Sequence, residues 1–321
     1  MDVDDGSTVQ MPQVLIYHEK RAMEYARELL QMGYTNVAVA STRAEAEKLI
    51  SGAEVLFGWR FSPALFNLEQ HVKWIQMMGA GVEDIVASPL IPAHIPITRI
   101  TGQFGQPIAE YILAFVLHVV KQVDRFRYQQ AENSWSPFAT ETLAAQTLAV
   151  AGIGSIGETI VNFGRAFQMR VIGLSESGRQ AHLVDRHYTA EQWEEFAAQA
   201  DVLVLSLPLT ESTREIIDAR ILSALKTSAI LVNIGRGALI REDDLIEHMR
   251  NRRLRAAILD VFQVEPLPAD SPLWRLPNVY ITPHVSGPSS VPDVSRFFFA
   301  NLKRYMAGQT LIGVVDRTRG Y

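Results

Sequence analysis

The chain of 321 residues contains no cysteine. This absence excludes disulfide bonds, thiolate catalysis and cysteine-ligated metal sites, and it fits a reducing compartment. Long apolar runs are scarce as well, since the longest helix-like one, residues 111–120, is far shorter than the ~20 residues that a membrane-spanning helix needs. The first residues, Met1–Ser7, are acidic and lack the pattern of a signal peptide. We therefore expect a soluble cytoplasmic protein with a loose tail at residues 1–8.

An excess of positive charge is also missing. The formal net charge is −5, which does not favour a broad surface for nucleic acid or anionic membranes. No cluster of histidine or carboxylate residues has the spacing of metal ligands, so we expect no metal site. What remains is an ordinary globular composition, 48% hydrophobic and 20% charged, over a length that suggests about two domains.

The most informative stretch is Leu148–Gly157, where four apolar residues run into the pattern G-x-G-x-x-G. A tight turn, a close approach of backbone to a pyrophosphate and the packing of a helix on a strand each require one of the glycines. The helix N-terminus offers unpaired amides to the phosphates. A plain glycine-rich turn is the alternative, but a second strand at 171–174 closes a βαβ unit of about 30 residues. The expected cofactor-binding residues here are Gly152, Gly154, Ser155, Ile156 and Gly157.

Strand-like and helix-like segments alternate along the chain, which predicts parallel sheets and an α/β fold class. The expected strands are residues 14–17, 37–40, 55–58, 74–78, 148–151, 171–174, 202–207, 230–233, 256–259 and 279–282. The expected helices are residues 22–32, 44–50, 108–123, 219–225, 243–251 and 294–306, with one more after the glycine loop. Residues 124–147 are expected to be polar and irregular.

Prolines and glycines mark two crossings between domains, near residues 105 and 287. We expect two doubly wound parallel-sheet domains, with a Rossmann-type dinucleotide-binding domain at residues 106–287. It would be inserted into a flavodoxin-like substrate domain made of residues 9–105 and 288–321. Two crossings of this kind favour hinge closure over a ligand.

Three further motifs follow expected strands, where ligands bind in open α/β sheets. Asn233–Gly237 presents Arg236 between glycines, and a guanidinium binds a carboxylate bidentately, although a surface arginine in a turn is an equal alternative. Asp260–Pro266 supplies two carboxylates, which could also be solvated loop residues. Thr282–Gly287 holds His284 in a turn framed by proline and glycine. A Glu265–His284 pair would suit general acid–base chemistry, whereas His118 in the apolar helix is expected to be a packed or hydrogen-bonded core residue.

These segments resemble the D-isomer-specific 2-hydroxyacid dehydrogenases over essentially the whole chain, and most closely their glyoxylate/hydroxypyruvate reductase branch. The matching motifs are Gly79–Val82, Ala109–Glu110, Gly152–Gly157, Leu207–Thr210 with Thr213, Asn233–Gly237, Asp260–Pro266, Ser271–Trp274, Asn278–His284 and Val315–Tyr321. The resemblance implies an oxidoreductase that transfers a hydride from NAD(P)H to C2 of a 2-keto acid and forms the D-2-hydroxy acid. It also implies a homodimer and a small-molecule substrate.

The resemblance assigns roles to individual residues. Arg236 would hold the substrate carboxylate and polarise the keto oxygen, His284 would donate the proton, and Glu265 would support His284. Backbone amides at Ala80 and Gly81 would bind the substrate carboxylate, and such amides form anion nests. Trp59 lies in the substrate-contacting loop of the family, and Arg60 either reaches a second anionic group or is simply exposed. Further cofactor contacts are expected at Leu207, Pro208, Thr213, Ile234, Asp260 and Gly287.

The fingerprint departs from its usual form after residue 174. Ser175 stands where an acidic residue normally bonds the ribose hydroxyls of NAD. Ser175, Ser177 and Arg179 could donate hydrogen bonds to the 2′-phosphate of NADP. Glu176 would favour NADH if it faced the ribose and NADPH if it faced solvent. We expect NADP or NAD as cofactor, with NADPH favoured.

Two alternatives use the same architecture. Some relatives are nucleotide-sensing corepressors that recruit partner proteins, and Arg236, Glu265 and His284 can persist in them; the lack of long disordered arms weighs against this role. A hydrolase that uses transient oxidation would need longer insertions. Related formate dehydrogenases carry glutamine at the position of Glu265, so this residue argues against that activity.

Overall fold

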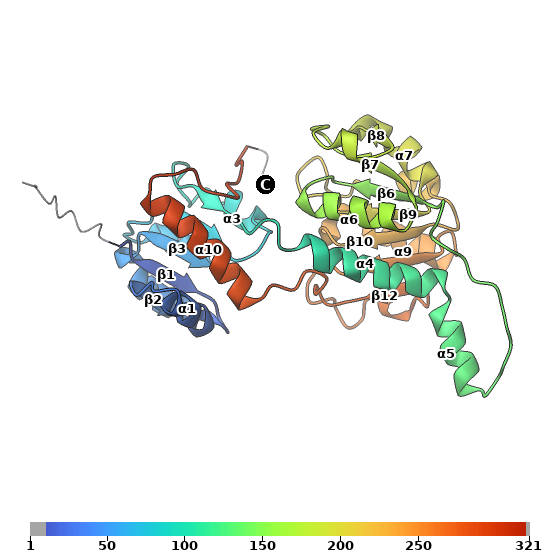
Figure 1. The fold of residues 1–321 in the computed structure, drawn as a ribbon, viewed down its shortest axis with the longest axis horizontal. Helices are drawn as coiled ribbons and strands as arrows, with labels where there is room; N and C mark the ends of the chain where they lie inside the picture. Colours follow the sequence, from blue (N-terminus) through green and yellow to red (C-terminus); the bar gives the residue numbers. More distant parts are fainter. Residues whose placement is uncertain (1–10, 319–321) are drawn as a thin grey trace, which may run out of the picture. The chain divides into compact units, whose positions relative to one another are not determined.

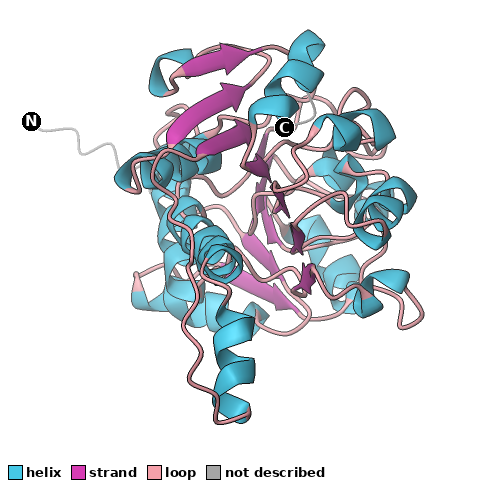
Figure 2. Cartoon of the chain, turned by 90° about the vertical axis from the view of Figure 1, so that its right-hand side faces the viewer, coloured by secondary structure: helices cyan, strands magenta, loops and turns pink. Residues whose placement is uncertain are grey.

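The computed structural model describes residues 11–318, so the predicted tail at residues 1–8 and the end of the Val315–Tyr321 motif lie outside the described part. The chain divides into two compact units, Met1–Gln103 with Ser289–Tyr321, and Phe104–Pro288 (Figure 1). Each contains a sheet flanked by helices, of five and seven strands respectively (Figure 2). Every strand pairing within these sheets is parallel, which confirms the predicted α/β class. Within residues 11–318, no helix is both long and apolar enough to cross a membrane.

The sheet of the first unit has the strand order β2-β1-β3-β4-β5. The strands are β1 (Val14–Tyr17), β2 (Val37–Ala40), β3 (Val55–Gly58), β4 (Trp74–Met77) and β5 (Ile97–Thr98). The helices are α1 (Ala22–Gln31), α2 (Arg43–Leu49), α3 (Glu83–Val86) and α10 (Val291–Met306). Every residue of β1, β3 and β4 is buried, because a parallel sheet is covered by helices on both faces.

Helix α10 returns from the second unit and completes the core of the first. Ser290 caps it, since its Oγ accepts a hydrogen bond from the backbone N of Asp293 at 3.1 Å. Phe298 then stacks on Phe57 of β3, with ring centroids 4.1 Å apart. The buried Asn301 donates from Nδ2 to Oε1 of Gln76 at 3.1 Å, so two buried amides satisfy each other. The first unit is therefore assembled from both ends of the sequence.

The sheet of the second unit has the strand order β12-β11-β10-β9-β6-β7-β8. The strands that follow β6 in the chain lie on both sides of it, so the strand order reverses at β6 although all strands are parallel. The strands are β6 (Thr147–Ala151), β7 (Arg170–Leu174), β8 (Arg186–Tyr188), β9 (Val202–Leu205), β10 (Ile230–Asn233), β11 (Ala256–Leu259) and β12 (Val279–Ile281). The helices are α4 (Gly105–Val120), α5 (Val123–Ala131), α6 (Ser155–Ala166), α7 (Trp193–Gln199), α8 (Ala219–Ala224) and α9 (Glu242–Arg250). Ligands of doubly wound sheets bind at such a reversal, outside the carboxyl ends of the strands.

Alternate residues of the central strands face different helix layers. Ala149 and Leu203 lie in one hydrophobic core with Phe196 of α7 and Ile221 of α8. The neighbouring residue Leu148 faces the other way, since a Cβ on Gly164 of α6 would lie 2.4 Å from its Cδ2. The carboxyl ends of β6, β7 and β9 are thereby held between two rigid layers.

Two expectations around residue 120 need correction, namely the bounds of the apolar helix and the irregular character of the segment after it. The helix expected at 108–123 runs from Gly105 to Val120 and ends where Gln122 adopts a φ of +52°. The segment expected to be irregular contains α5, which has no buried residue and therefore no apolar periodicity to detect. The sequence patterns also gave no indication of β5, β8, α3 or α7, because elements of two to seven residues carry little periodic signal.

Candidate active site

The glycine loop joins β6 to α6. Gly152 has a φ of +95°, and a Cβ there would lie 2.6 Å from the carbonyl oxygen of Ser206. A Cβ on Gly157 would lie 2.1 Å from the carbonyl oxygen of Gly152. Both positions therefore require glycine, one for the left-handed turn and both for close packing. Gly154 differs, because no heavy atom lies within 4 Å of its Cβ position, so its backbone is open to a ligand. Ser155 and Ile156 begin α6, where the first amides have no partner within the helix.

The turn after β7 contains the four residues that are expected to contact the ribose or its 2′-phosphate. Ser175 is only 8% exposed, and its Oγ lies 2.8 Å from Nε2 of His187 in β8. Glu176, Ser177 and Arg179 are exposed on the turn that follows. The position of His187 next to this turn was not predicted from the sequence, because β8 has only three residues and shows no strand pattern.

The segment after β9 carries Leu207, Pro208 and Thr213. The hydroxyl of Thr213 donates to the carbonyl oxygen of Pro208 at 2.7 Å and accepts from the backbone N of Thr210 at 2.8 Å. Leu207 packs against the hydrophobic core of the second unit. This segment is therefore a tight, self-bonded turn at the carboxyl end of β9.

Arg236 lies in the turn after β10 that Asn233 shapes. The fully buried Asn233 accepts a hydrogen bond from the backbone N of Gly235 at 3.1 Å and donates to the carbonyl oxygen of Arg236 at 2.9 Å. A Cβ on Gly237 would lie 1.9 Å from the carbonyl carbon of Phe262. The turns after β10 and β11 are consequently packed backbone to backbone, which fixes Arg236 relative to the segment that carries Glu265. Ile234, between Asn233 and Gly235, is buried.

Glu265 and His284 form the expected pair. Nδ1 of His284 lies 2.8 Å from Oε2 of Glu265, and the other carboxylate oxygen accepts from the backbone N of Phe262 at 3.1 Å. An ionised carboxylate only accepts, so Nδ1 carries the proton of this bond. Nε2 of the half-exposed imidazole is then the atom that can exchange a proton with a ligand.

Asp260 holds the turn that carries His284. This fully buried carboxylate accepts from the Thr282 hydroxyl at 2.6 Å and from the backbone N of Val285 and of Ser286 at 2.8 and 3.0 Å. His284 itself adopts a φ of +55°. A left-handed conformation is uncommon for a residue with a side chain, so these bonds hold His284 in place.

A tyrosine extends this network. The hydroxyl of Tyr111, in α4, lies 2.7 Å from Oγ1 of Thr282. Because Thr282 must donate to the carboxylate, Tyr111 is the donor to Thr282. Burial raises the pKa of Tyr111 to about 12, so the donor stays protonated at neutral pH. At the end of the same turn, Gly287 lies against Ile108 of α4, whose Cδ1 would be 3.2 Å from a Cβ at that glycine.

The first unit carries the remaining expected residues. Trp59 follows β3, and its ring covers Gly79, where a Cβ would lie 2.1 Å from Cζ3. The exposed Arg60 has its guanidinium carbon 5.5 Å from the centroid of that ring. Ala80 accepts a hydrogen bond at its carbonyl oxygen from Nη1 of Arg99 at 3.2 Å, and Gly81 follows it. Trp59, Arg60 and the Gly79–Gly81 turn thus lie together within this unit.

A family model decides the classification. The model for the NAD binding domain of D-isomer specific 2-hydroxyacid dehydrogenases matches residues 113–286. The chain belongs to this family. The dehydrogenase is therefore an oxidoreductase, and the resemblance inferred from its motifs is confirmed.

Individual relatives agree with this classification. A glyoxylate/hydroxypyruvate reductase A from Serratia proteamaculans is 33% identical over 84% of this chain and 88% of its own length. The crystal structure of a family member from Aeromonas salmonicida has a TM-score of 0.86 at 35% identity, covering 95% of this chain and 99% of that chain. An NADPH-dependent glyoxylate/hydroxypyruvate reductase from Sinorhizobium meliloti, in complex with NADP and sulfate, has a TM-score of 0.86 at 28% identity, covering 96% and 100%. These similarities confirm the glyoxylate/hydroxypyruvate reductase branch.

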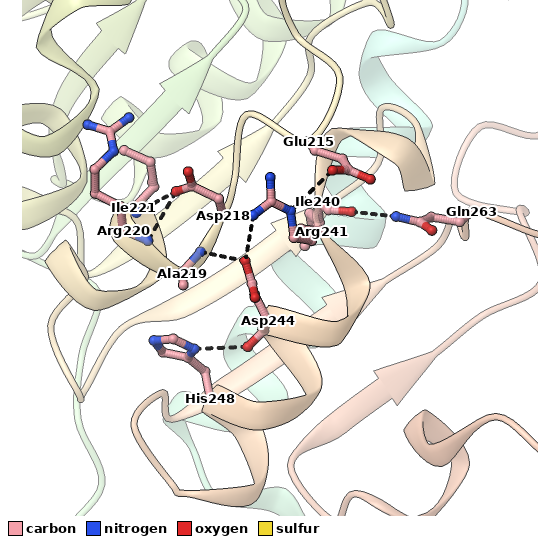
Figure 3. A network of polar contacts seen from close by, with 10 residues as sticks. All are labelled: Glu215, Asp218, Ala219, Arg220, Ile221, Ile240, Arg241, Asp244, His248 and Gln263. Atoms are coloured by element: carbon pink, nitrogen blue, oxygen red, sulfur yellow. Dashed lines mark hydrogen bonds and ion pairs between the residues drawn. The ribbon is translucent and has the colours of Figure 1, made fainter.

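A polar network in the dehydrogenase braces the turns next to Arg236 and Glu265 (Figure 3). Gln263 donates from Nε2 to the carbonyl oxygen of Ile240 at 3.0 Å. Arg241 pairs with Glu215 at 3.1 Å and with Asp244 at 3.6 Å. Like Tyr111, these positioning residues were not predicted from the sequence, because their partners come from distant parts of the chain. Asn233 lies within a predicted motif, but its positioning role was not predicted. Within residues 11–318, no three His, Asp or Glu side chains come together to hold a metal ion.

Proposed function

We propose that the dehydrogenase reduces a small 2-keto acid, of the glyoxylate or hydroxypyruvate type or larger, to the D-2-hydroxy acid. NADPH is the preferred reductant, and His284 is the proton donor. The observation that supports this most is the 2.8 Å contact between His284 Nδ1 and Glu265 Oε2, which leaves Nε2 for the substrate. The carboxylate of Glu265 accepts the hydrogen bond from Nδ1 and so fixes the tautomer and the orientation of the imidazole.

The second unit fits a dinucleotide. Gly154 is open to a ligand, Gly152 and Gly157 allow the close turn, and the first amides of the 12-residue helix α6 are suited to a pyrophosphate. No acidic side chain follows β7 directly, and the Sinorhizobium relative was solved with NADP. When bound, the dihydronicotinamide supplies the hydride. Ser175, Ser177 and Arg179 are the residues that would hold a 2′-phosphate, while Ile234, Asp260, Leu207, Pro208, Thr213 and Gly287 would line the rest of the site.

The chain's own groups account for the remaining chemistry. The guanidinium of Arg236 would bind the substrate carboxylate and stabilise the negative charge that develops on the keto oxygen. His284 would deliver its proton from Nε2 to that oxygen, and Glu265 would hold the resulting imidazole in the correct tautomer. In the first unit, the amides of Ala80 and Gly81 are proposed to bind the carboxylate, with Trp59 as a further substrate contact.

The proposal includes a homodimer in the cytoplasm. Helix α5 and the chain after it project from the second unit (Figure 1), and the aromatic side chains of Tyr128 and Trp135 on this projection are 68% and 96% exposed. Exposed aromatic surface of this kind is typical of protein interfaces. Light scattering coupled to gel filtration would measure the mass, and a monomer at micromolar concentration would exclude the dimer.

A panel of 2-keto acids tests the activity. Glyoxylate, hydroxypyruvate, pyruvate, phenylpyruvate and branched 2-keto acids would each be assayed with NADPH and with NADH by absorbance. Turnover of at least one acid, faster with NADPH, is the expected result. If no acid is turned over although the dinucleotide binds, a nucleotide-sensing binding protein replaces the proposal.

A further inference from the structure

The turn after β4 contains two backbone amides that are available to a ligand. Residues 79–81 follow the carboxyl end of β4, where ligands bind in parallel sheets. Within residues 11–318, no acceptor meets the backbone N of Ala80 or of Gly81, although both residues are partly buried. Backbone amides that are withdrawn from water are nearly always paired, so these two are suited to an anionic ligand.

The carbonyl groups of the same turn are held from one side. The carbonyl oxygen of Gly79 accepts from the backbone N of Ile100 at 3.0 Å. The carbonyl oxygen of Ala80 accepts from Nη1 of Arg99 at 3.2 Å. In a trans peptide the C=O and the N–H that follows it point in opposite directions. The N–H groups of Ala80 and Gly81 therefore point away from residues 99 and 100.

A second side of the turn is closed by Trp59. A Cβ on Gly79 would lie 2.1 Å from Cζ3 of that ring, so only glycine fits beneath the indole. The turn is thus held between the indole of Trp59 and the segment that follows β5, and its two amides keep one fixed direction.

Arg99 extends from a backbone that the C-terminal part of the chain fixes in place. Its backbone N donates to the carbonyl oxygen of Gly313 at 2.9 Å. A Cβ on Gly313, which has a φ of +75°, would lie 2.4 Å from the carbonyl oxygen of Arg99. Thr98 and Val314 form an antiparallel bridge beside it. The guanidinium therefore starts from a rigid base.

We propose that Arg99 is a positioning residue for the carboxylate of the substrate. Its hydrogen bond holds the peptide between Ala80 and Gly81 in the orientation that presents the N–H of Gly81. The positive charge on the carbonyl side also polarises this peptide and makes its N–H a stronger donor. The inference rests on the proposed function, because it takes the ligand of the two amides to be the carboxylate of a 2-keto acid.

This role differs from the role proposed for Arg236. Arg236 would touch the reacting atoms, whereas Arg99 would act only through the peptide that it orients. A carboxylate bears the same charge in the substrate and in the transition state, so the amides bind both equally. Loss of such uniform binding raises KM and leaves kcat unchanged.

Oxamate is the probe for the test, since it has the carboxylate and the neighbouring carbonyl of a 2-keto acid but accepts no hydride. Calorimetric titration of oxamate into the protein saturated with NADPH gives its Kd without turnover. In R99M, which removes the donors but keeps an unbranched stem, the Kd for oxamate should rise about tenfold. KM for a 2-keto acid should rise in parallel, while kcat stays within about twofold and the Kd for NADPH is unchanged.

Two further variants separate positioning from a loss of charge or of structure. R99K keeps a charged donor and should restore the affinity for oxamate to within about threefold of the wild type. R27M removes an exposed arginine of α1 in the same unit and should bind oxamate like the wild type. If R99M does not fold, R99Q takes its place, and its Kd for oxamate should rise about threefold or more because the charge is lost.

Three results would overturn the inference. The first is a wild-type affinity for oxamate in R99M or, if that variant does not fold, in R99Q. The second is a fall of kcat with KM unchanged, and the third is an equal loss of NADPH and oxamate affinity, which would make Arg99 merely structural. If the wild type binds NADPH but neither binds oxamate nor reduces any 2-keto acid, the proposed function fails as well.

Discussion

Nδ1 of His284 lies 2.8 Å from Oε2 of Glu265, and both side chains follow strands of the same sheet. Replacing Glu265 by glutamine keeps the shape but weakens the hydrogen bond that holds Nδ1 of His284, because a charged acceptor binds more strongly than a neutral one. Because this bond fixes the tautomer in which Nε2 faces a ligand, we expect kcat of E265Q to fall by about tenfold or more. Steady-state assays of 2-keto acid reduction measure this, and an unchanged kcat would contradict the role of Glu265.

The hydrogen bonds that Asp260 accepts from the turn of His284 should contribute to the stability of the fold. In D260N, one of the two oxygens that accept from Thr282, Val285 and Ser286 becomes an NH₂ group and faces donors. We expect a loss of about 2 kcal/mol or more in the free energy of unfolding. Urea denaturation gives this number. D243N, at an exposed position of α9, is the matched control and should change stability by less than about 0.5 kcal/mol.

The raised pKa of Tyr111 predicts that the free energy of unfolding falls at alkaline pH. Its pKa is raised by burial from 10.0 to about 12, so between these values the unfolded chain loses a proton that the folded chain keeps. Stability from this group is therefore full below pH 10 and is lost as pH rises toward 12. We expect Y111F to make the fall in unfolding free energy over this window shallower. Y128F, at a position 68% exposed, should leave it unchanged, and equal slopes in Y111F and wild type would contradict the burial of Tyr111.

Alanine substitutions at two glycines with positive φ distinguish the stability cost of backbone strain from the stability cost of close packing. Gly308 has a φ of +64° and nothing within 4 Å of its Cβ position, whereas Gly152 also meets the backbone of Ser206 at 2.6 Å. G308A should cost about 1–2 kcal/mol from strain alone. G152A should cost more and should also weaken dinucleotide binding. Thermal unfolding and fluorescence titration measure both effects, and equal costs with intact binding would refute the role of Gly152.

How much of this site can be predicted depends on how far apart in the sequence its interacting residues lie. The glycine loop could be predicted because the roles of Gly152 and Gly157 depend on local spacing. Glu265 and His284 could be predicted because each lies in a short motif that begins at the end of an expected strand. The hydrogen bond from Tyr111 to Thr282 could not, since it joins residues 171 positions apart. His187 was hidden because a three-residue strand has no periodicity, and α5 because an exposed helix has no apolar face.

The central claim is that His284 supplies the proton while other residues bind the cofactor. The most direct measurement compares turnover and cofactor affinity in H284A and the wild type, using a 2-keto acid that the wild type reduces. We predict that kcat falls by about 10²–10⁴-fold while Kd for NADPH stays unchanged. Near-normal turnover in H284A would contradict the claim.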